Sequence, residues 1–522
     1  MELPILTAAQ MRAAEEAAFA SGIQVEALMD EAGAGVAQVV SKFFKKPGRC
    51  IVFAGKGHNA GDALFAAQCL AMHGWKIEVR LAFREADCSE LMRKKLNDLR
   101  NTTTRVPAQT ELAAGTTILE FSAQTVDESS LLQKAIAQDA CVGSIAPLII
   151  LDGLLGVGAK SPLREPIRAA CRCINGLRTT IGAYVFAVDL PTGLDTDSGK
   201  PDRDCVIADF TITIGCAKPG LLADGASDYV GRLAVVPLPD LRPPKAKPRE
   251  IIANRVAFCG LLARRRYNSY KNQFGRIAVV AGSKGFVGAA LMASEGALRA
   301  GAGLVEVFVP EEIYSIVAGA AFMEAMVKPI ASYRELLREK PDVWAVGPGL
   351  GKTHAEEILE FIQNAKQKMV LDADGLNIVS EKPSALRHCK GKRLLTPHPG
   401  EMKRLFPGEK QSRARTATKF CSRFPVTLLL KGSRTIVAER ARPLSYNTTG
   451  NPGMATGGMG DVLTGVCAGL LGQDLSLYDA ARIGAWVCGR AAEIAIFNNG
   501  QSEQSLLARD VLNNLGEAFK EL

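Results

Sequence analysis

The chain of 522 residues is several times longer than the commonest domain size, so it must contain more than one hydrophobic core. Hydrophobic residues make up 47% of it and charged residues 22%, a globular composition that excludes disordered, collagen-like and coiled-coil chains. The formal net charge of +9 is scattered and aromatic residues are only 6%, so the basic, aromatic surface of a nucleic-acid-binding protein is not expected.

The sequence lacks three features that would place the protein in a membrane or outside the cell. No apolar run approaches the roughly 18 residues that a membrane-spanning helix requires. The 13 cysteines are odd in number and form no C-x-x-C pair, which is typical of reduced thiols in a cytoplasmic protein. Thr7 and Gln10 have the spacing of a capping box that opens a helix through Ala20, rather than the layout of a signal peptide. We therefore expect a cytoplasmic protein without a membrane partner.

The first half of the chain alternates helix-like and strand-like segments. A helical pattern over 25–44 precedes an apolar strand at 50–54, and a glycine-rich turn then leads to a helix over 61–73 and a strand over 76–83. This order predicts a βαβ unit. Further strands are predicted at 147–151, 184–188 and 210–214, so a parallel sheet with helices on both faces, in three layers, is favoured.

Five prolines and several charges interrupt every periodic pattern between 237 and 250. We place a linker at 239–255, between one domain at 1–238 and a second at 256–522. The second domain repeats the α/β alternation and ends in two long helical patterns. Its strands are predicted at 276–280, 304–309, 343–346, 369–371, 393–395 and 426–430.

A glycine-rich turn follows the strand at 50–54, with the sequence Gly55-Lys56-Gly57-His58-Asn59-Ala60-Gly61-Asp62-Ala63. Glycines permit close approach of the backbone, and the free N–H groups at the start of the next helix bind anions, so a phosphate-bearing ligand fits this turn. A tight turn that needs positive φ would have the same composition, and the turn alone does not decide between the two.

Two aspartates come after neighbouring strands of the first domain. Asp152 follows the strand at 147–151, and Asp189 follows the strand at 184–188. Carboxylates at adjacent strand ends could share a cation or divide proton transfer between them, and either could instead cap the helix that follows.

These segments resemble NAD(P)H-hydrate epimerase domains, whose pattern runs Gly-x-Gly-Asn-Asn-Gly-Gly-Asp-Gly, then Asp before Leu-Leu-Gly-x-Gly, then Asp-x-Pro-Ser-Gly. The resemblance spans roughly 1–238 and implies a Rossmann-like domain that interconverts the R and S epimers of hydrated NADH and NADPH. By position, it implies that Asn59, Asp152 and Thr192 bind potassium and that Asp189 is the acid/base residue. It also implies substrate contacts by Asp189 and by two segments, His58, Asn59, Ala60, Gly61 and Asp62, and Gly156, Val157, Gly158, Ala159, Lys160, Ser161 and Pro162.

The first domain departs from that pattern at a few positions. His58 replaces an Asn, Ala60 and Ala63 replace glycines, and Thr192 stands for Ser while retaining a hydroxyl and a carbonyl. The changes at His58 and Ala63 leave one alternative open, that this domain is a binding or scaffold module without catalysis.

The densest signal in the second domain is Asn451-Pro452-Gly453-Met454-Ala455-Thr456-Gly457-Gly458-Met459-Gly460-Asp461, directly before an apolar helix predicted over 462–471. Glycine N–H groups at a helix start, with the helix dipole, form an anion hole for a phosphoryl group in transfer. Asp461 can then accept a proton from a substrate hydroxyl that attacks phosphorus. An acidic residue that only favours the helix dipole is the alternative, but four glycines would cost about 1 kcal/mol each in a structural helix start.

This ending resembles ribokinase-like proteins, and six further segments narrow the resemblance to ADP- or ATP-dependent NAD(P)H-hydrate dehydratases over about 256–522. The segments are Gly282–Ala290, Arg299–Leu304, Gly347–Gly351, Leu371–Asn377, Thr396–Glu401 and Leu430–Ser433. The resemblance implies that Ala289, Gly349, His398 and Asp461 contact the hydrated nucleotide. It implies that Lys431, Gly432, Ser433, Arg434, Thr435 and Gly460 hold ADP with Mg²⁺.

Several of these residues have a second interpretation. His398, between two prolines, could merely shape a turn, and Lys431 could be a solvated strand end. Asp372 and Asp374 could orient magnesium or a helix start. Arg434 replaces a glycine of the family's loop and could add a phosphate contact or restrict the loop.

Nearly the whole chain resembles bifunctional NAD(P)H-hydrate repair enzymes. The resemblance implies epimerisation of the hydrates NADHX and NADPHX, then phosphorylation of the S form's hydroxyl at the expense of ADP, with Asp461 as base. Loss of phosphate would restore NAD(P)H and leave AMP. A homo-oligomer is expected, and ADP is preferred over ATP by analogy alone. The alternative function is a ribokinase-like vitamin-precursor kinase fused to a non-catalytic binding domain.

Overall fold

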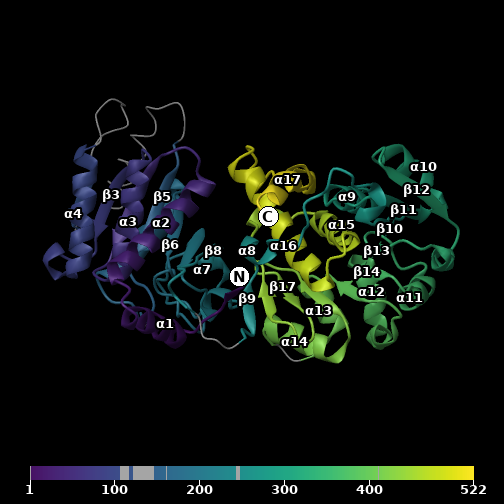
Figure 1. The fold of residues 1–522 in the computed structure, drawn as a ribbon, viewed down its shortest axis with the longest axis horizontal. Helices are drawn as coiled ribbons and strands as arrows, with labels where there is room; N and C mark the ends of the chain where they lie inside the picture. Colours follow the sequence, from purple (N-terminus) through teal and green to yellow (C-terminus); the bar gives the residue numbers. More distant parts are fainter. Residues whose placement is uncertain (1, 106–116, 121–145, 160, 243–246, 409–410) are drawn as a thin grey trace. The chain divides into compact units, whose positions relative to one another are not determined.

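A computed structural model describes residues 2–105, 117–120, 146–159, 161–242, 247–408 and 411–522 (Figure 1). The chain divides into two compact units. One is Pro4–Lys247, and the other is Pro248–Leu522 together with the N-terminal residues up to Leu3. Both are α/β, and the fold class predicted from the sequence is confirmed.

The N-terminal unit contains a seven-stranded sheet in which all strand pairs are parallel, in the order β4-β3-β2-β5-β6-β7-β8. The chain builds outward from β2 to β4 and then resumes on the other side of β2, so the order reverses between β2 and β5. Ligands bind at the carboxyl ends of strands at such a reversal. The strands are β2 (Arg49–Ala54), β3 (Lys76–Leu81), β4 (Thr117–Glu120), β5 (Leu148–Gly153), β6 (Tyr184–Val188), β7 (Phe210–Ile214) and β8 (Arg232–Val236).

Helices cover both faces of this sheet because side chains alternate along its buried strands. Ile51 of β2 packs in one cluster with Ile174 of α6 (Ile167–Ile181). On the opposite face, Phe186 of β6 stacks on Phe210 at 4.5 Å between ring centroids, and Phe210 lies 4.7 Å from Phe43 of α2 (Val25–Phe43). Helix α3 (His58–Met72) packs on α2, so the unit has three layers as predicted.

The N-terminal helix α1 (Ala8–Ala20) begins at the predicted capping box. Thr7 Oγ1 accepts a hydrogen bond from the Gln10 N–H, and the Gln10 side chain accepts one from the Thr7 N–H. The unit also contains α4 (Glu90–Arg105), which packs on α3, and the short α7 (Ser227–Val230).

The C-terminal unit contains an eleven-stranded sheet in the order β1-β9-β18-β17-β16-β15-β14-β13-β10-β11-β12. Strands β10 to β16 run parallel, whereas β17 is antiparallel to both of its neighbours, so this edge of the sheet is mixed. Strand β9 lies within the range predicted as linker. The strands are β1 (Leu3–Pro4), β9 (Glu250–Ile252), β10 (Arg276–Val280), β11 (Leu304–Pro310), β12 (Ala325–Ile330), β13 (Val343–Val346), β14 (Lys368–Leu371), β15 (Arg393–Leu395), β16 (Thr427–Leu430), β17 (Ile436–Ala438) and β18 (Leu444–Tyr446).

Strand β13 shows how this sheet is covered on both faces. Val343 and Ala345 belong to the cluster that includes α15 (Met459–Gly472), whereas Trp344 points the other way and lies 4.8 Å from Phe361 of α11 (Ala355–Asn364). Three helices end the chain where the sequence predicts two. The remaining helices are α8 (Arg255–Phe258), α9 (Val287–Arg299), α10 (Glu311–Ala320), α12 (Ala373–Glu381), α13 (Pro399–Leu405), α14 (Arg413–Arg423), α16 (Leu477–Phe497) and α17 (Ala508–Lys520).

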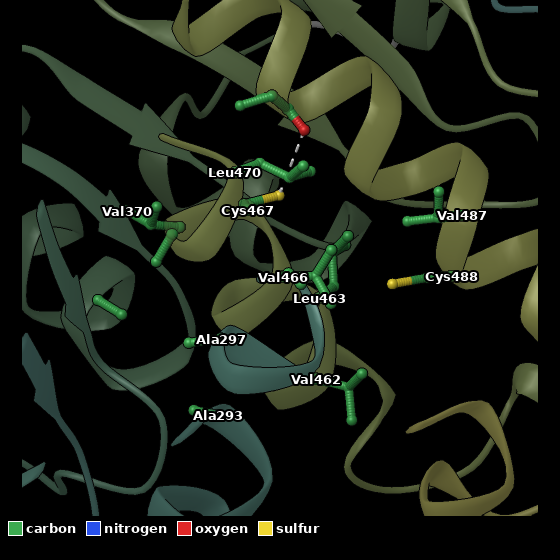
Figure 2. Packing of buried hydrophobic residues seen from close by; sticks show 14 of the residues in the cluster. Ala293, Ala297, Val370, Val462, Leu463, Val466, Cys467, Leu470, Val487 and Cys488 are labelled. Carbon is green, nitrogen blue, oxygen red and sulfur yellow. Dashed lines mark hydrogen bonds between the residues drawn. The ribbon is translucent and has the colours of Figure 1, made fainter. Parts of the chain in front are cut away.

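Helices α9 and α15 meet backbone to backbone, because glycines replace side chains at their crossing. A Cβ atom on Gly465 would lie 1.9 Å from the carbonyl oxygen of Ala293, and a Cβ on Gly296 would lie 2.6 Å from that of Val462. Figure 2 shows Ala293 and Ala297 of α9 beside Val462 and Val466 of α15. This crossing fixes the helix that carries Asp461.

Replacing Gly465 with alanine should therefore destabilise the C-terminal unit by about 1–3 kcal/mol, because the new methyl group must push the two helices apart. Urea denaturation would measure the loss. The matched control is Gly516→Ala on the exposed side of α17, where a Cβ meets nothing within 4 Å and helix propensity should stabilise the chain by up to about 1 kcal/mol. Equal effects of the two substitutions would contradict the backbone contact.

Candidate active sites

The turns singled out in the second domain lie at one edge of its sheet, because parallel strands present their carboxyl ends together. The strand order reverses between β10 and β13, and helix α15 begins at the same edge. The turns are Gly282–Gly285 after β10, Gly347–Gly351 after β13, Asp372 after β14, Thr396–Glu401 after β15 and Lys431–Thr435 after β16.

A buried ion pair ties this edge together. Lys431 Nζ donates to Asp372 Oδ1 at 2.7 Å, and Thr464 Oγ1 of α15 donates to Asp372 Oδ2 at 2.9 Å. A Cβ on Gly460 would lie 3.2 Å from both Asp372 Oδ2 and Lys431 Nζ, so the first turn of α15 rests on the pair. Lys431 is thus not a solvated strand end.

Lys431 remains a cation at this position. Burial lowers the pKa of its ammonium group, but the carboxylates of Asp372 and Glu401 outweigh burial and hold the pKa above its ordinary value. A buried, permanently charged ammonium beside a helix N-terminus is suited to phosphate.

Asp461 lies in the first turn of α15, which begins at Met459 rather than at the predicted 462. The preceding Gly458 has φ of +88° and caps the helix, a conformation that favours glycine. Within the described residues, no hydrogen bond is made by the Asp461 carboxyl group. Burial and then the charge of Asp372 raise the pKa of Asp461 to about 7, although Lys431 opposes the shift. A carboxyl group with this pKa can exchange protons near neutral pH.

Two predicted substrate contacts lie side by side where the strand order reverses between β10 and β13. Gly349 has φ of +64°, and a Cβ there would lie 3.1 Å from the Cβ of Ala289 in the first turn of α9. Ser283 Oγ donates to the Gly349 carbonyl at 2.7 Å and holds the two turns together.

His398 has the turn-shaping role that was one of its two interpretations. Its Nδ1 accepts from the N–H groups of Gly400 and Glu401 at 3.0 and 3.3 Å, and Glu401 Oε2 accepts from the His398 N–H at 2.8 Å. These bonds cap α13. Half of the His398 side chain is exposed, and contact with a substrate stays a prediction.

The loop after β16 is braced by Arg413 of α14, which the sequence does not single out. Arg413 Nη1 donates to the Lys431 carbonyl at 3.3 Å and Nη2 to the Arg434 carbonyl at 2.8 Å, while Thr435 Oγ1 donates to the Gly432 carbonyl at 3.1 Å. Arg434 is 4% exposed, which favours a restricting role in the loop over an outward phosphate contact.

Asp374 orients a helix start, since its Oδ2 accepts from the Gly351 N–H at 2.9 Å and its Oδ1 from Asn377 Nδ2 at 3.1 Å. Its neighbour Asp372 is held by Lys431 and Thr464, so the two aspartates have separate roles.

The three predicted potassium ligands come together in the N-terminal unit. Asp152 lies inside β5, fully buried, and accepts from Thr192 N at 2.8 Å and Thr192 Oγ1 at 2.7 Å. Asn59 Nδ2 donates to the Leu155 carbonyl at 3.1 Å, and the Leu155 N–H donates to Thr192 Oγ1 at 3.2 Å. Burial raises the pKa of Asp152 to about 6, against the hydrogen bonds from Thr192.

The donor set at Asn59, Asp152 and Thr192 consists of amide, carboxylate, hydroxyl and carbonyl oxygens, which suit a hard cation. Across the described residues, no three His, Cys, Asp or Glu side chains gather as a metal-binding group. The oxygen set therefore fits a weakly held alkali ion better than a transition metal.

Asp189 belongs to a separate group of contacts, so the two strand-end aspartates do not share partners. Its carboxyl forms a buried ion pair with Lys218, which is 1% exposed and follows β7. Asp189 has φ of +66°, a strained conformation for a non-glycine residue that is found at functional sites. Lys218 was not predicted from the sequence. Its position after a strand that ends at the same edge of the sheet could have indicated it as a site residue.

The two predicted substrate-lining segments lie next to the predicted potassium ligands Asp152 and Thr192, and one of them contains the third, Asn59. His58 begins α3 and is exposed, and Gly156 lies against the Asn59 side chain. Ala60 and Ala63 are buried within α3 at negative φ, so alanine fits in place of the family's glycines. Ser161 Oγ donates to Asp202 at 2.5 Å, whereas the predicted contact Lys160 lies outside the described residues.

Among the helices that the structure describes, none has the length and apolar character needed to cross a membrane.

Two family models match the chain. The model described as YjeF-related protein N-terminus matches residues 25–220, and the model described as NAD(P)H-hydrate dehydratase matches residues 277–514.

Similar proteins span the full chain. A bifunctional NAD(P)H-hydrate repair enzyme Nnr of Moorella thermoacetica is 31% identical over 95% of this chain and 92% of its own length. Proteins of the same name from Coxiella burnetii and Escherichia coli are each 32% identical over 97% of this chain and over 97% and 91% of their own lengths. Among solved structures, the ADP/ATP-dependent NAD(P)H-hydrate dehydratase from Bacillus subtilis, co-crystallised with ATP and Mg²⁺, is 27% identical. It covers 50% of this chain and 94% of its own, with a TM-score of 0.45.

Proposed function

The chain belongs to the family of bifunctional NAD(P)H-hydrate repair enzymes, and on that premise we propose that its two units carry out the two steps of nicotinamide nucleotide repair. The N-terminal domain, at 1–238, interconverts the R and S epimers of NADHX and NADPHX. The C-terminal domain, at 256–522, converts the S form to NAD(P)H at the expense of ADP.

The observation that carries the dehydratase proposal is the position of Asp461, in the first turn of α15 over the Lys431–Asp372 pair. Asp461 accepts the proton of the substrate hydroxyl as the hydroxyl oxygen attacks the terminal phosphorus of ADP. The N–H groups at the start of α15 and the Lys431 ammonium stabilise the charge that develops on the phosphoryl oxygens. Phosphate then leaves the ring far more easily than hydroxide, and the double bond forms.

The nucleotide site consists of the loop from Lys431 to Thr435, braced by Arg413, together with Gly460. Magnesium bound with the nucleotide would neutralise charge on the phosphates. The hydrated nicotinamide lies toward Ala289, Gly349 and His398.

Oxygens of Asn59, Asp152 and Thr192 would hold a potassium ion, which would supply electrostatic attraction for the substrate. Residues 58–62 and 156–162 bind the hydrate, and Gly156 lies against the Asn59 side chain. Asp189, which Lys218 anchors, exchanges the proton.

The alternative of a vitamin-precursor kinase with a non-catalytic N-terminal domain is not favoured, because relatives that span the full chain are named as bifunctional repair enzymes. Ala60 and Ala63, moreover, occupy helical positions that accept a methyl group.

One experiment tests both activities in the intact chain. A mixture of R and S hydrates of NADH is incubated with ADP, or with ATP, and the recovery of reduced-nicotinamide absorbance is followed. Complete conversion supports both activities, and a stop at the initial S fraction shows that the epimerase is inactive. A phosphorylated product without recovered absorbance would contradict the dehydratase and favour the kinase.

Exchange of K⁺ for tetramethylammonium should slow epimerisation at least about tenfold and lower the melting temperature. An ion at 100 times its Kd stabilises the fold by about 2.7 kcal/mol. Thermal unfolding with increasing K⁺ measures the effect. Thr192→Ser retains the hydroxyl and should retain the response, whereas Thr192→Val should weaken it; an equal response in both variants would contradict the assigned ligands.

A further inference from the structure

A cavity of about 300 Å³ opens in the N-terminal unit between α1, α2 and the first turn of α3. Its volume is at the lower end of the range for small-molecule sites. Its lining contains both apolar and ionisable side chains, which suits a ring with a polar substituent. The apolar side chains include Phe19, Leu28 and Met29, and the ionisable ones include Glu15, His58 and Asp62.

Asp62 presents an unengaged carboxyl group to this cavity. It lies just after the first turn of α3 and is half-buried, and no hydrogen bond to its side chain occurs within the described part of the chain. Burial, followed by the negative charges of Asp189 and Glu15, raises the pKa of Asp62 well above its usual range. Its carboxyl group therefore retains its proton where ordinary aspartates have lost theirs.

The Asp189 carboxyl group, unlike that of Asp62, is hydrogen-bonded, and all of its hydrogen bonds are to one oxygen, Oδ1. The Ile214 N–H donates to Asp189 Oδ1 at 3.0 Å, Thr213 Oγ1 lies 3.2 Å from the same atom, and Lys218 Nζ also donates to it. Among described residues, Oδ2 makes no hydrogen bond and its lone pairs are available. Ile214 lines the cavity, and its backbone N–H is the donor to Asp189, so Asp189 lies next to this part of the lining.

The contacts of Lys218 indicate one role, which is to hold Asp189 in place. It is 1% exposed, and besides Asp189 it donates to Thr213 Oγ1 and to the Ile214 carbonyl, each at 3.0 Å. A buried ammonium group held at three points fixes the orientation of its carboxyl partner.

Other charged groups also act on Asp62. The charge of Lys218 lowers its pKa, whereas that of Asp30 on α2 raises it further. On α1, burial and then Asp189 raise the pKa of Glu15, while Lys218 and Arg12 oppose the shift. The ionisable groups that face Asp62 from the surrounding elements are Arg12, Glu15 and Glu16 on α1, Asp30 on α2, His58 on α3, Asp189 after β6 and Lys218 after β7.

We propose that Asp62 is the acid and Asp189 the base of epimerisation, and that Lys218 is the positioning residue that holds Asp189 through Oδ1 and leaves Oδ2 free to accept a proton. The proposal rests on the epimerase function proposed above and adds a division of roles between two carboxyl groups. It also assigns the cavity to the hydrated nicotinamide ring.

The chemistry balances without a further reactant. Water adds to an enamine double bond with its hydroxyl on the carbon next to nitrogen, so the hydroxyl of the hydrate can leave with help from the nitrogen lone pair. Asp62 protonates the hydroxyl, the carbon–oxygen bond breaks, water departs and a carbon–nitrogen double bond forms. A water molecule then attacks the other face, its proton passes to Asp189 Oδ2 and the electron pair returns to nitrogen. Before the next conversion Asp62 takes up a proton from solvent and Asp189 releases one, so both carboxyl groups return to their starting states.

The test follows the purified R hydrate of NADH with the intact chain and no adenine nucleotide, so that only epimerisation occurs. Chromatography measures the appearance of the S form between pH 5 and 9, with protein-free rates subtracted. The variants are Asp62→Asn, Asp62→Glu, Lys218→Met and Lys218→Arg, and Asp87→Asn is the matched control at an exposed carboxylate. Dehydration of the S hydrate with ADP, measured separately, verifies the concentration of active chain.

We expect Asp62→Asn to lower kcat by about 10²–10⁴-fold with little change in KM, and to abolish the fall in rate at alkaline pH. Asp62→Glu, which retains a proton donor, should recover part of the rate. Lys218→Met should lower kcat with little change in KM, because Asp189 loses the group that orients it, and Lys218→Arg should recover part of the rate. Asp87→Asn should match the unaltered chain.

The proposal is overturned if Asp62→Asn scrambles the R hydrate at the parental rate, if Asn and Glu at this position lose activity equally, or if Lys218→Met leaves kcat unchanged. If the unaltered chain dehydrates the S hydrate but does not scramble the R hydrate, the epimerase function itself is wrong and this inference falls with it.

Discussion

Replacing Asp461 with asparagine is expected to lower the dehydration rate by about 10²–10⁴-fold, because the substrate hydroxyl loses its proton acceptor at the start of α15. The amide has the same shape, so binding of the hydrate and of ADP should change little. Recovery of reduced-nicotinamide absorbance from the purified S hydrate measures kcat and KM separately.

The unaltered chain should also reveal this group in its pH profile. A base must be deprotonated to act, and burial together with Asp372 raises the pKa of Asp461 to about 7. The rate should therefore fall by up to about tenfold per pH unit below that value. Asp474→Asn, at an exposed carboxylate after the other end of α15, is the matched control and should be silent. A parental rate in Asp461→Asn would remove the chemical basis of the proposed dehydratase.

The second large effect is expected from the ion pair beneath Asp461. Lys431→Met removes the charge that lowers the pKa of Asp461, so the acidic limb of the dehydratase profile should move to higher pH. It also removes a phosphate contact, and kcat/KM for ADP should fall by about 10- to 100-fold, the equivalent of a charged hydrogen bond. Asp372 is left buried without its cation, which should destabilise the unit by about 3–5 kcal/mol.

Asp372→Asn should shift the same limb in the opposite direction, because it removes the negative charge that raises the pKa of Asp461. Opposite displacements in the two variants would identify Asp461 as the titrating group, since no single loss of stability produces both. Lys352→Met, which breaks an exposed pair with Glu381, is the control for removal of a lysine charge. Shifts in the same direction would contradict the assignment.

Local features of the chain are those that the sequence predicts well. The capping box at Thr7, the strands at Tyr184–Val188, Arg276–Val280 and Val343–Val346, and the α/β class depend on neighbours a few residues apart, so periodicity and turn residues suffice to predict them. Short strands such as β17 and β18 have too few residues to establish a period, and their pairing depends on contacts distant in the chain.

The motifs also indicate which turns matter, because parallel strands must present their carboxyl ends at one edge. They do not indicate which distant residues form hydrogen bonds with the side chains in these turns. Lys218 lies 29 residues from Asp189, and Thr464 lies 92 residues from Asp372, separations at which no sequence spacing predicts a hydrogen bond. The sequence by itself determined the two α/β domains, their family and the carboxylates at strand ends. Only the tertiary structure decided the environment of each carboxyl group, because burial and charges from distant segments raise the pKa values of Asp62 and Asp461, and a lysine distant in the chain holds Asp189.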